Sequence, residues 1–374
     1  MDEDTHLIYL TARSFPGSTA DHVSIRQLSQ GFARALPGRF TLVVNQRGAA
    51  EDLPLPRVVE LGLGRHFRTI RLLSMFPRLH RSLSRAGMTR MIYFSNDPYI
   101  LLILCLYTKL VRGYEICANW HHLNGYVIDA IVGRIADFHV CNTAYLRSHL
   151  TKRYRIQDER SLVSPQAIDL EVFKRDPEQA LQVRHILVSE GKILLGYFGR
   201  FTTMSMDKGI DSILRTLALL DDRYVFLAAG GYPADIARYE QAAREAGVSD
   251  RVIFKGESSQ RELALFEQAC DILLMPFPFN EHYAYMMSAM KMFEYMASGT
   301  AIIATDLPSI TEVLSENNAL LIPPDDDQAL ASAIKKLSED PAWRTRIAER
   351  AFVDIQTYTW TEKARTIASF LRIA

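Results

Sequence analysis

The sequence predicts an α/β protein with two doubly wound, Rossmann-like domains. Short apolar runs alternate along the chain with stretches whose apolar residues recur at helical spacing, which is typical of parallel strands joined by helices. The chain has 374 residues, more than one hydrophobic core normally serves, so two domains are expected. Its net charge of zero and its 48% of hydrophobic residues are typical of an ordinary globular protein.

The composition argues against a secreted, membrane-spanning or metal-binding protein. The four cysteines lie in apolar surroundings and form no Cys-x-x-Cys pair, so we interpret them as reduced core residues: Cys105, Cys117, Cys141 and Cys270. The longest apolar run, residues 99–106, is too short to cross a bilayer. Acidic residues at positions 2–4 precede the first apolar run, unlike a secretory signal. We therefore expect a cytoplasmic protein.

The first domain is expected to begin with a strand, a glycine-containing loop and a helix. The strand is residues 7–10, and the helix runs from about Asp21 to Ala35. The loop between them carries Gly17 and Ser18, which are candidates for contact with a phosphate. A simple turn before the helix explains the same residues equally well.

Short apolar runs predict five more strands and one buried helix in this domain: strands 40–44, 58–61, 91–94, 115–119 and 138–141, and helix 98–111. We place the first domain at residues 1–175. The last helix of the chain, within residues 358–374, is expected to pack back on it. Residues 174–191 are charged and loosely patterned, which predicts a linker.

A strongly basic stretch lies within the first domain. Residues 65–90 contain seven arginines and no acidic residue, and apolar residues interleave with the arginines. Such a helix is typical of contact with a membrane surface, through anionic lipid or the pyrophosphate of a lipid-linked acceptor. A helix that packs one face on the sheet and exposes its arginines to water fits the pattern as well. We do not expect nucleic acid as a partner, because no recognition motif accompanies the charge.

Two adjacent histidines, His121 and His122, follow the strand predicted at 115–119. The carboxyl end of a strand in a doubly wound sheet is where a binding cleft forms. Adjacent residues of an extended chain point to opposite faces, so the two imidazoles are unsuited to a shared metal ion. We expect one of them to face the cleft, and the sequence does not distinguish which. In the alternative interpretation both form only local hydrogen bonds.

The second domain, residues 190–357, is expected to start with the strand 193–198. Gly199 then allows a phosphate to approach the backbone, Arg200 presents its guanidinium to two oxygens, and Lys208 adds a point charge. The insertion TTMSMD lengthens the loop between Arg200 and Lys208. Further strands of this domain are predicted at 225–229, 252–255, 272–275, 301–304 and 320–322.

One stretch of this domain, residues 270–312, has the order strand, loop, helix, strand. Ser288 stands where an N-cap is expected, and Lys291 and Glu294 share a face of the helix that follows. Backbone amides around Met287 and Ser288 are placed to hold a phosphate, Lys291 to neutralise it, and Glu294 to accept hydrogen bonds from ribose hydroxyls. The same spacing also fits a surface helix with an ion pair and a polar loop before it.

The stretch SAMKMFEYMASGTAIIATD resembles the nucleotide-sugar site of the GT4 (group 1) glycosyltransferases, which have the GT-B fold. In that family the glutamate of the FEYMA motif holds the nucleotide ribose, and here it is Glu294. The resemblance also makes Arg200 and Lys208 the Arg–Lys pair that binds the donor diphosphate, next to Gly199. It places Gly230 in a turn that faces the nucleotide.

The resemblance extends to the first domain, with departures. The family often has a histidine at the position of His121 and His122 that touches the donor sugar or its phosphate. Many members carry a glutamate where Met286 stands, so either Glu281 substitutes for it or backbone amides meet the diphosphate unaided. Gln166 and Ala167 replace the usual Asn-Gly of a turn near the sugar, and the loop at 15–22 lacks the usual pair of adjacent glycines.

The resemblance implies two Rossmann-like domains facing across a cleft, with a nucleotide-sugar donor on the second and an acceptor on the first. The implied reaction moves a sugar from a nucleoside diphosphate to an acceptor hydroxyl, with retention of configuration. No metal ion or other cofactor is expected, because cationic side chains can stabilise the leaving diphosphate. The candidate catalytic residues are His121, His122, Arg200, Lys208 and Glu281.

The basic stretch 65–90 suggests a saccharide or lipid-linked saccharide as the acceptor, in cell-surface polysaccharide or glycolipid assembly at the inner face of the membrane. Two alternatives stay open. A non-catalytic partner subunit with a degenerate donor site would explain Met286. A sugar-nucleotide epimerase of the same fold would need acid and base carboxylates, and Glu281 is the one obvious carboxylate near the right place.

Overall fold

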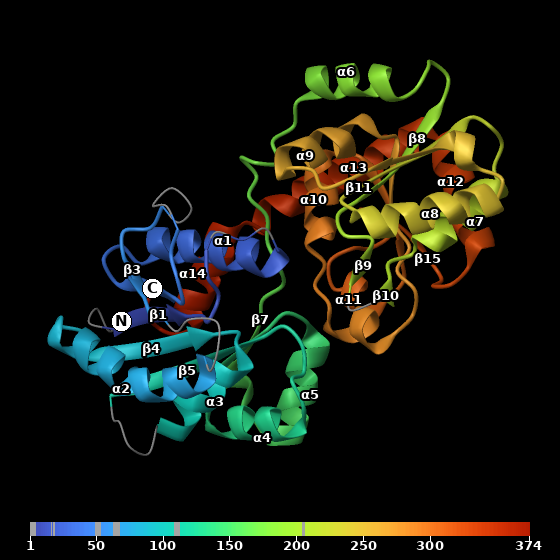
Figure 1. Cartoon of the computed structure of the whole chain (residues 1–374). Coiled ribbons are helices and arrows are strands. Elements are labelled where there is room, and N and C mark those ends of the chain that lie inside the picture. Colours follow the sequence, from blue (N-terminus) through green and yellow to red (C-terminus); the bar gives the residue numbers. More distant parts are fainter. Residues whose placement is uncertain are drawn as a thin grey trace. The chain divides into compact units, whose positions relative to one another are not determined.

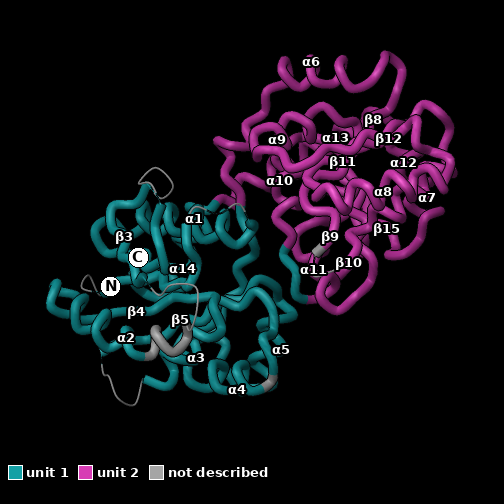
Figure 2. Tube along the Cα trace, in the orientation of Figure 1, with its two compact units in different colours: residues 1–167, 286–288, 360–374 teal, residues 168–285, 289–359 magenta. Residues whose placement is uncertain are grey.

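The computed structural model describes residues 5–374 except residues 16, 18, 49–53, 63–67, 108–112 and 204–205. By its contacts the chain forms two compact units (Figures 1 and 2). Unit 1 comprises Met1–Ala167, Met286–Ser288 and Trp360–Ala374, and unit 2 comprises Ile168–Tyr285 and Ala289–Thr359. Each unit contains a parallel sheet with helices packed against it, so the predicted fold class, α/β with two doubly wound domains, is confirmed.

The seven strands of unit 1 are all parallel, in the order β3-β2-β1-β4-β5-β6-β7. Their bounds are β1 Thr5–Leu10, β2 Phe40–Val44, β3 Val58–Glu60, β4 Arg90–Ser95, β5 Tyr114–Trp120, β6 Phe138–Cys141 and β7 Ser161–Val163. The order reverses between β1 and β4, and ligands of doubly wound sheets bind beyond the carboxyl ends of strands at such a point. The strands predicted at 40–44 and 138–141 are confirmed to the residue.

The helices of unit 1 are α1 Ala20–Ala35, α2 Arg68–Arg85, α3 Pro98–Tyr107, α4 Tyr126–Ile135, α5 Ala144–Tyr154 and α14 Trp360–Phe370. The helix predicted at 98–111 is present as α3, and residues 108–111 lie outside the described part of the chain. The C-terminal helix α14 packs against α1. Gly31 makes this approach possible, because a Cβ at that position would lie 2.5 Å from the Trp360 carbonyl oxygen.

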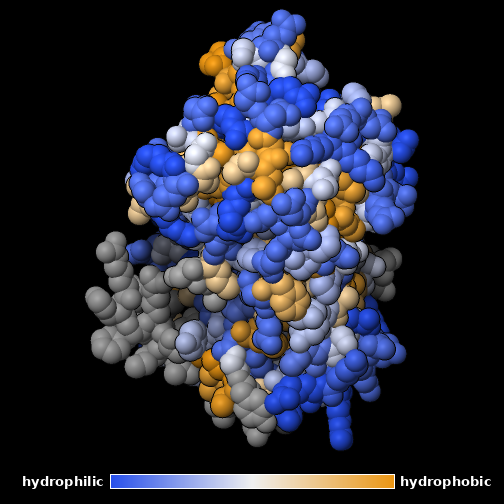
Figure 3. Space-filling model, turned by 90° about the vertical axis from the view of Figure 1, so that its right-hand side faces the viewer, coloured by the Kyte–Doolittle hydropathy of each residue, from blue (hydrophilic) through white to orange (hydrophobic). Residues whose placement is uncertain are grey.

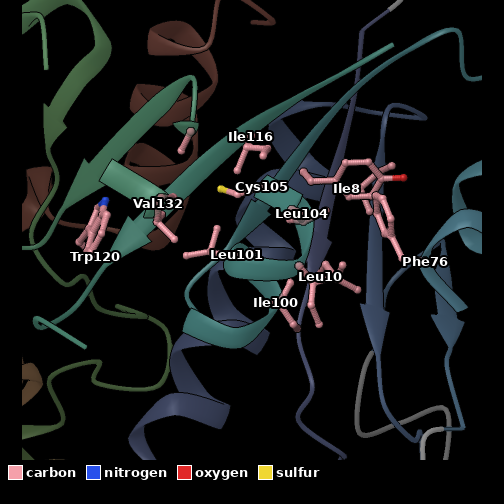
Figure 4. Packing of buried hydrophobic residues seen from close by; sticks show 14 of the residues in the cluster. Ile8, Leu10, Phe76, Ile100, Leu101, Leu104, Cys105, Ile116, Trp120 and Val132 are labelled. Atoms are coloured by element: carbon pink, nitrogen blue, oxygen red, sulfur yellow. The ribbon is translucent and has the colours of Figure 1, made fainter. Parts of the chain in front are cut away.

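Apolar side chains from the central strands and from α2, α3 and α4 form the core of unit 1 (Figure 4). Those that the figure labels are Ile8, Leu10, Phe76, Ile100, Leu101, Leu104, Cys105, Ile116, Trp120 and Val132. All four cysteines of the chain are buried and free, as predicted. Burial raises the pKa of the Cys105 and Cys141 thiols to about 12, so both stay protonated.

The basic stretch 65–90 contains α2. Residues 65–67 lie outside the described part of the chain, as do the side chains of 68–73. Further along the helix, Phe76, Leu79 and Leu83 are buried in the core, and the arginines at 78, 81 and 85 are exposed. One face of this helix therefore packs inward and the other presents positive charge to the surroundings.

The main sheet of unit 2 has six parallel strands in the order β12-β11-β8-β13-β14-β15. Their bounds are β8 Ile193–Phe198, β11 Tyr224–Ala229, β12 Val252–Lys255, β13 Ile272–Met275, β14 Ala301–Thr305 and β15 Leu320–Ile322. A separate two-stranded hairpin is formed by β9 Thr202–Thr203 and β10 Met206–Asp207. The strands predicted at 193–198, 252–255, 272–275 and 320–322 are confirmed to the residue.

The helices of unit 2 are α6 Pro177–Leu187, α7 Ile210–Ala218, α8 Pro233–Glu245, α9 Gln260–Ala269, α10 Met290–Ser298, α11 Pro308–Thr311, α12 Asp327–Glu339 and α13 Pro341–Asp354. The prediction that residues 174–191 form a linker is wrong in one respect, because this segment contains α6. Asp176 caps this helix by accepting from the Gln179 backbone N–H at 3.1 Å, and α6 packs against α9. Asp-Pro at its start is a helix signal that the surrounding charge obscured.

Among the described residues, no helix combines the length and the apolar character that crossing a bilayer requires. On the face drawn in Figure 3, hydrophilic residues are the most numerous and hydrophobic residues form patches between them.

Candidate active site

Two glycines bring the ends of neighbouring strands in unit 2 close together. Gly199 follows β8 and Gly230 follows β11, with φ angles of 102° and 108° that favour glycine. A Cβ on Gly230 would lie only 2.7 Å from the Gly199 carbonyl oxygen. The φ angles disfavour a side chain at both positions, and the backbone of Gly230 packs closely against that of Gly199 at the carboxyl edge of the sheet. That a phosphate approaches the backbone at Gly199 stays a prediction.

The insertion between Arg200 and Lys208 folds back on itself. Thr203 pairs with Met206 and Thr202 with Asp207 in the antiparallel hairpin β9–β10. The hairpin returns the chain toward its starting point, so the extra residues do not separate the two cations. Burial and the nearby charge of Arg200 lower the pKa of Lys208 to about 8.

Lys208 is fixed in place by the residue after it. Gly209 has a φ of 94° and begins α7, and a Cβ there would lie 2.0 Å from the Pro276 carbonyl oxygen. Its N–H donates to the Asp207 carboxylate at 2.5 Å. The turn that carries Lys208 is thus pressed against the loop after β13.

Substituting Gly209 should therefore destabilise the protein strongly. We expect Gly209→Ala to lower the free energy of unfolding by about 3 kcal/mol, from left-handed backbone strain and a clash with backbone. The measurement is denaturant unfolding. Gly256→Ala is the matched control, because Gly256 has open space around its Cβ position and no left-handed φ. Equal stability of the two variants would contradict this account.

The helix α10 begins at Met290, and its N-cap residue is Ala289, which makes no side-chain cap. The prediction that Ser288 caps this helix is wrong. The Ser288 hydroxyl oxygen instead accepts from the Gln166 backbone N–H at 2.9 Å, within unit 1. Met286 packs against the core of unit 1, and Met287 is half-buried. The local pattern predicted that this hydroxyl bonds to the start of the helix, but it bonds to Gln166, which is more than a hundred residues away in the sequence.

Lys291 is a buried cation of unit 2 beside Gly199. Only 7% of the residue is exposed, and its Nζ lies 3.3 Å from the centroid of the Tyr197 ring. Its Cε is 3.6 Å from the Cβ position of Gly199. Within the described part of the chain its ammonium has no hydrogen-bond acceptor. Burial, together with the charge of Lys208, holds the pKa of Lys291 well below its usual value.

Two acidic residues lie near this lysine. Burial raises the pKa of Glu294 to about 7, and Lys291 opposes the shift. Glu267, from α9, is completely buried, and neither carboxylate oxygen has a hydrogen-bond partner among the described residues. Burial and the neighbouring Glu294 raise the pKa of Glu267 well above its usual value, so it is a neutral acid. The sequence analysis missed Glu267, because a single glutamate in an amphipathic helix normally faces water.

Arg200 is held by two side chains from neighbouring loops. Its Nη2 donates to the Glu257 carboxylate at 2.6 Å, and its Cζ lies 3.8 Å from the centroid of the Tyr232 ring. Its Nη1 is buried and makes no hydrogen bond within the described residues. The sequence analysis did not single out Tyr232 or Glu257, since neither lies in a recognisable motif.

Glu281 is exposed and directly precedes a π-helical turn, His282–Met286. The sequence placed it in a plain loop. The turn is anchored from inside unit 2: Tyr283 is buried, its N–H donates to Asn280 Oδ1 at 2.8 Å, and its ring centroid lies 5.2 Å from that of Phe277.

In unit 1 the structure distinguishes the two histidines. His121 is half-buried, and His122 is exposed. Asn119 Nδ2 lies 3.1 Å from His121 Nε2, and because an amide nitrogen only donates, the ring proton is on Nδ1. Burial and the charge of Lys363 lower the pKa of His121 to about 4, so its ring is neutral at neutral pH.

The loop before α1 is described only in part. Ser18 lies outside the described residues. Gly17 rests against the ring of His22, where a Cβ would be 2.2 Å from Cδ2. Gln166, from the turn that departs from the family pattern, accepts from the Ser24 hydroxyl at 3.2 Å. The carbonyls of Ser164 and Pro165 in the same turn accept from the buried ammonium of Lys363, at 2.9 Å and 2.5 Å.

The unit 2 site therefore gathers Arg200, Lys208 and Lys291 around an open backbone, with Glu294 beside them. Two of its donors, Lys291 Nζ and Arg200 Nη1, are buried and unsatisfied within the described residues. Such a site suits an anion that brings several oxygen acceptors. Over the described ranges, no three His, Cys, Asp or Glu side chains are grouped so that they could hold a metal ion.

Comparison with known proteins agrees with this chemistry. The family model for glycosyl transferases group 1 matches residues 192–340. A D-inositol 3-phosphate glycosyltransferase of Stackebrandtia nassauensis is 28% identical over 238 residues, which cover 61% of this chain and 52% of that protein. A 2-deoxystreptamine glucosyltransferase of Streptomyces kanamyceticus is 30% identical over 186 residues, or 48% and 46% of the two chains. The chain thus spans about half the length of these curated relatives.

Solved structures match the whole chain in fold. Sucrose-phosphate synthase from Thermosynechococcus elongatus superposes with a TM-score of 0.78 at 18% identity, covering 98% of both chains. Anabaena HepE, solved in complex with UDP, gives a TM-score of 0.75 at 17% identity and covers 99% of this chain and 100% of its own. The match to the group 1 glycosyl transferases covers residues 192–340, within unit 2, and the whole chain has the GT-B fold of these solved structures.

Proposed function

We propose that the protein transfers a sugar from a nucleoside-diphosphate sugar to an acceptor hydroxyl. The observation that carries this proposal is a pair of buried donors next to Gly199, Lys291 Nζ and Arg200 Nη1, which have no acceptor among the described residues. A buried cation without an acceptor is costly for a folded protein, and a diphosphate would supply the missing acceptors. The complex of Anabaena HepE with UDP-glucose supports a nucleotide sugar as this ligand.

The chemical task of such a site is to stabilise the negative charge that develops on the leaving diphosphate. The fold holds Arg200, Lys208 and Lys291 close to one another before the ligand arrives, so they need little movement to stabilise this charge. Glu294 would accept the ribose hydroxyls, and Gly230 and the amides around Met287 and Ser288 would line the nucleotide. Of the two histidines, we expect His121, whose ring is neutral, to contact the donor sugar. By family resemblance we expect retention of configuration, with no metal ion required.

For the acceptor we propose a saccharide or lipid-linked saccharide in cell-surface polysaccharide or glycolipid assembly. Unit 1 supports this, because several large apolar side chains of α3, α4 and α5 are exposed: Tyr99, Leu106, Val127, Ile135 and Tyr145. Exposed arginines of α2 add positive charge to the same unit. Apolar side chains near cations suit an amphipathic acceptor at the inner face of the membrane. Among the structural neighbours, WaaG is a glycosyltransferase involved in lipopolysaccharide biosynthesis.

The experiment that tests the donor is thermal-shift binding of UDP, GDP and ADP to the wild type, Arg200→Ala and Glu294→Ala. At a ligand concentration of about a hundred times Kd, the matching nucleotide should stabilise the wild type by about 2.7 kcal/mol. Both variants should lose this stabilisation. No response to any nucleotide would contradict the proposal. Binding without transfer would favour the non-catalytic partner subunit, which Met286 suggests, and conversion of the donor without an acceptor would favour an epimerase.

Nucleotide affinity should fall as the pH rises above about 8. Burial and Arg200 lower the pKa of Lys208 to about 8 in the free protein, and a bound diphosphate raises it again. Below that pH the lysine is already charged. Above it the ligand must bind together with a proton, so Kd should rise by up to about tenfold per pH unit.

Calorimetric titrations across this range measure the effect. Lys291, whose pKa is also lowered, acts in the same direction. Lys208→Arg keeps its charge and should flatten the profile. Equally steep profiles for wild type and variant would assign the pH dependence to another group.

A further inference from the structure

Three side chains meet at the ends of three adjacent strands in unit 2. Arg200 follows β8, Tyr232 lies two residues after Gly230 at the end of β11, and Glu257 lies two residues after β12. These strands are neighbours in the sheet, in the order β12-β11-β8. The Arg200 guanidinium lies against the Tyr232 ring, with Cζ 3.8 Å from the ring centroid, and donates from Nη2 to Glu257 at 2.6 Å.

The partners of Arg200 differ in how firmly they hold it. Glu257 has 60% of its side chain exposed, and an exposed ion pair of this kind contributes little in water. Tyr232 is 48% exposed and presents a ring face to the cation, which holds the guanidinium plane without using any N–H. The Arg200 side chain is 30% exposed, and its Nη1 stays unsatisfied among the described residues. Glu257 therefore occupies one donor of the guanidinium and leaves another available.

We infer that Glu257 is an internal anion that the donor diphosphate displaces from Arg200, and that Tyr232 is a positioning residue that holds the guanidinium during this exchange. The inference rests on the proposed function. A diphosphate carries more negative charge than one carboxylate and offers oxygens to two guanidinium nitrogens at once. Glu257 keeps the cation paired until the nucleotide sugar arrives, and it competes with that ligand for Arg200.

Removing the charge of Glu257 should make the nucleotide bind more tightly. Glu257→Gln keeps the shape of the side chain and removes the competing anion, so the nucleoside diphosphate should bind about fivefold more tightly, or about 1 kcal/mol. The matched control is Glu349→Gln. Glu349 accepts from Arg175 at 3.2 Å in the same unit, also as an exposed pair, and its substitution should leave Kd unchanged.

Removing the ring of Tyr232 should impair the enzyme, in contrast to removing the charge of Glu257. Tyr232→Leu leaves Arg200 without its flat support, so kcat/KM for transfer should fall about tenfold. Tyr232→Phe should restore the wild-type value, because the ring face and not the hydroxyl contacts the guanidinium. A residue that only stabilised the fold would lower the melting temperature without this recovery by phenylalanine.

The decisive measurement is calorimetric titration of the nucleotide that stabilises the wild type, into wild type, Glu257→Gln and Glu349→Gln. Tighter binding by Glu257→Gln alone supports the inference. Unchanged or weaker binding by Glu257→Gln would overturn it, because Glu257 would then be a bystander or a ligand contact, and the proposed function would still stand. If no nucleotide binds to the wild type, both the inference and the proposed function fail.

Discussion

Replacing Lys291 by methionine should strongly weaken nucleotide binding and leave the free protein at least as stable as the wild type. In the free protein the ammonium is buried, lies over the Tyr197 ring and has no hydrogen-bond acceptor among the described residues. Burial holds the pKa of Lys291 well below its usual value, so folding works against its charged form. Methionine has a similar shape without that cost, so the unfolding free energy should stay equal or rise.

The effect on the ligand is expected to be large. A charge-assisted contact with phosphate inside a dry site is lost, so Kd should rise by about a hundredfold, or about 2.7 kcal/mol. Thermal unfolding with and without nucleotide measures both quantities on the same sample. A destabilised free protein would show that Lys291 has a structural partner.

Lys363→Met provides the contrasting variant. Lys363 is also strongly buried and burial lowers its pKa to about 7, but its ammonium donates to the Ser164 and Pro165 carbonyls. Methionine would leave these acceptors unpaired, which should lower stability by about 1 to 3 kcal/mol. Lys291→Met should therefore weaken ligand binding without lowering stability, whereas Lys363→Met should lower stability.

Glu267→Gln should make the protein more stable at neutral and alkaline pH, with little change at about pH 4 and below. Burial raises the pKa of Glu267 well above its usual value, and its carboxyl has no partner among the described residues. The folded protein keeps a proton that the unfolded chain releases above about pH 4.3. The stability of the wild type therefore falls as the pH rises, by up to about 1.4 kcal/mol per pH unit until the folded-state pKa is reached.

Glutamine mimics the protonated acid and removes this dependence. The difference in unfolding free energy between variant and wild type should thus increase with pH, which urea unfolding at several pH values would show. Glu240→Gln, on an exposed position of α8, is the control and should give curves parallel to the wild type. Parallel curves for Glu267→Gln would mean that a polar group near Glu267 compensates its charge.

The sequence by itself determined the class of the fold, and it supplied the candidate residues of the proposed donor site. Buried parallel strands are continuous apolar runs that end in glycine, proline or polar residues, so strands such as β8, β12 and β13 were located to the residue. Gly199, Arg200, Lys208, Lys291 and Glu294 could be proposed from the sequence because the roles expected of them depend on residue type and short spacing. Residue type and short spacing can be read from the amino-acid sequence without knowledge of the tertiary structure.

The tertiary structure decided which partner each side chain has. The Ser288 hydroxyl bonds to Gln166 and does not cap α10, because a distant backbone N–H competes for it. Glu257 and Tyr232 reach Arg200 because the sheet places β12 and β11 beside β8. Burial, together with the neighbouring Glu294, raises the pKa of Glu267, and burial with the charge of Lys363 lowers the pKa of His121. Burial, charge and hydrogen-bond partners depend on residues far apart in the chain, and a single sequence gives their identities without giving their contacts.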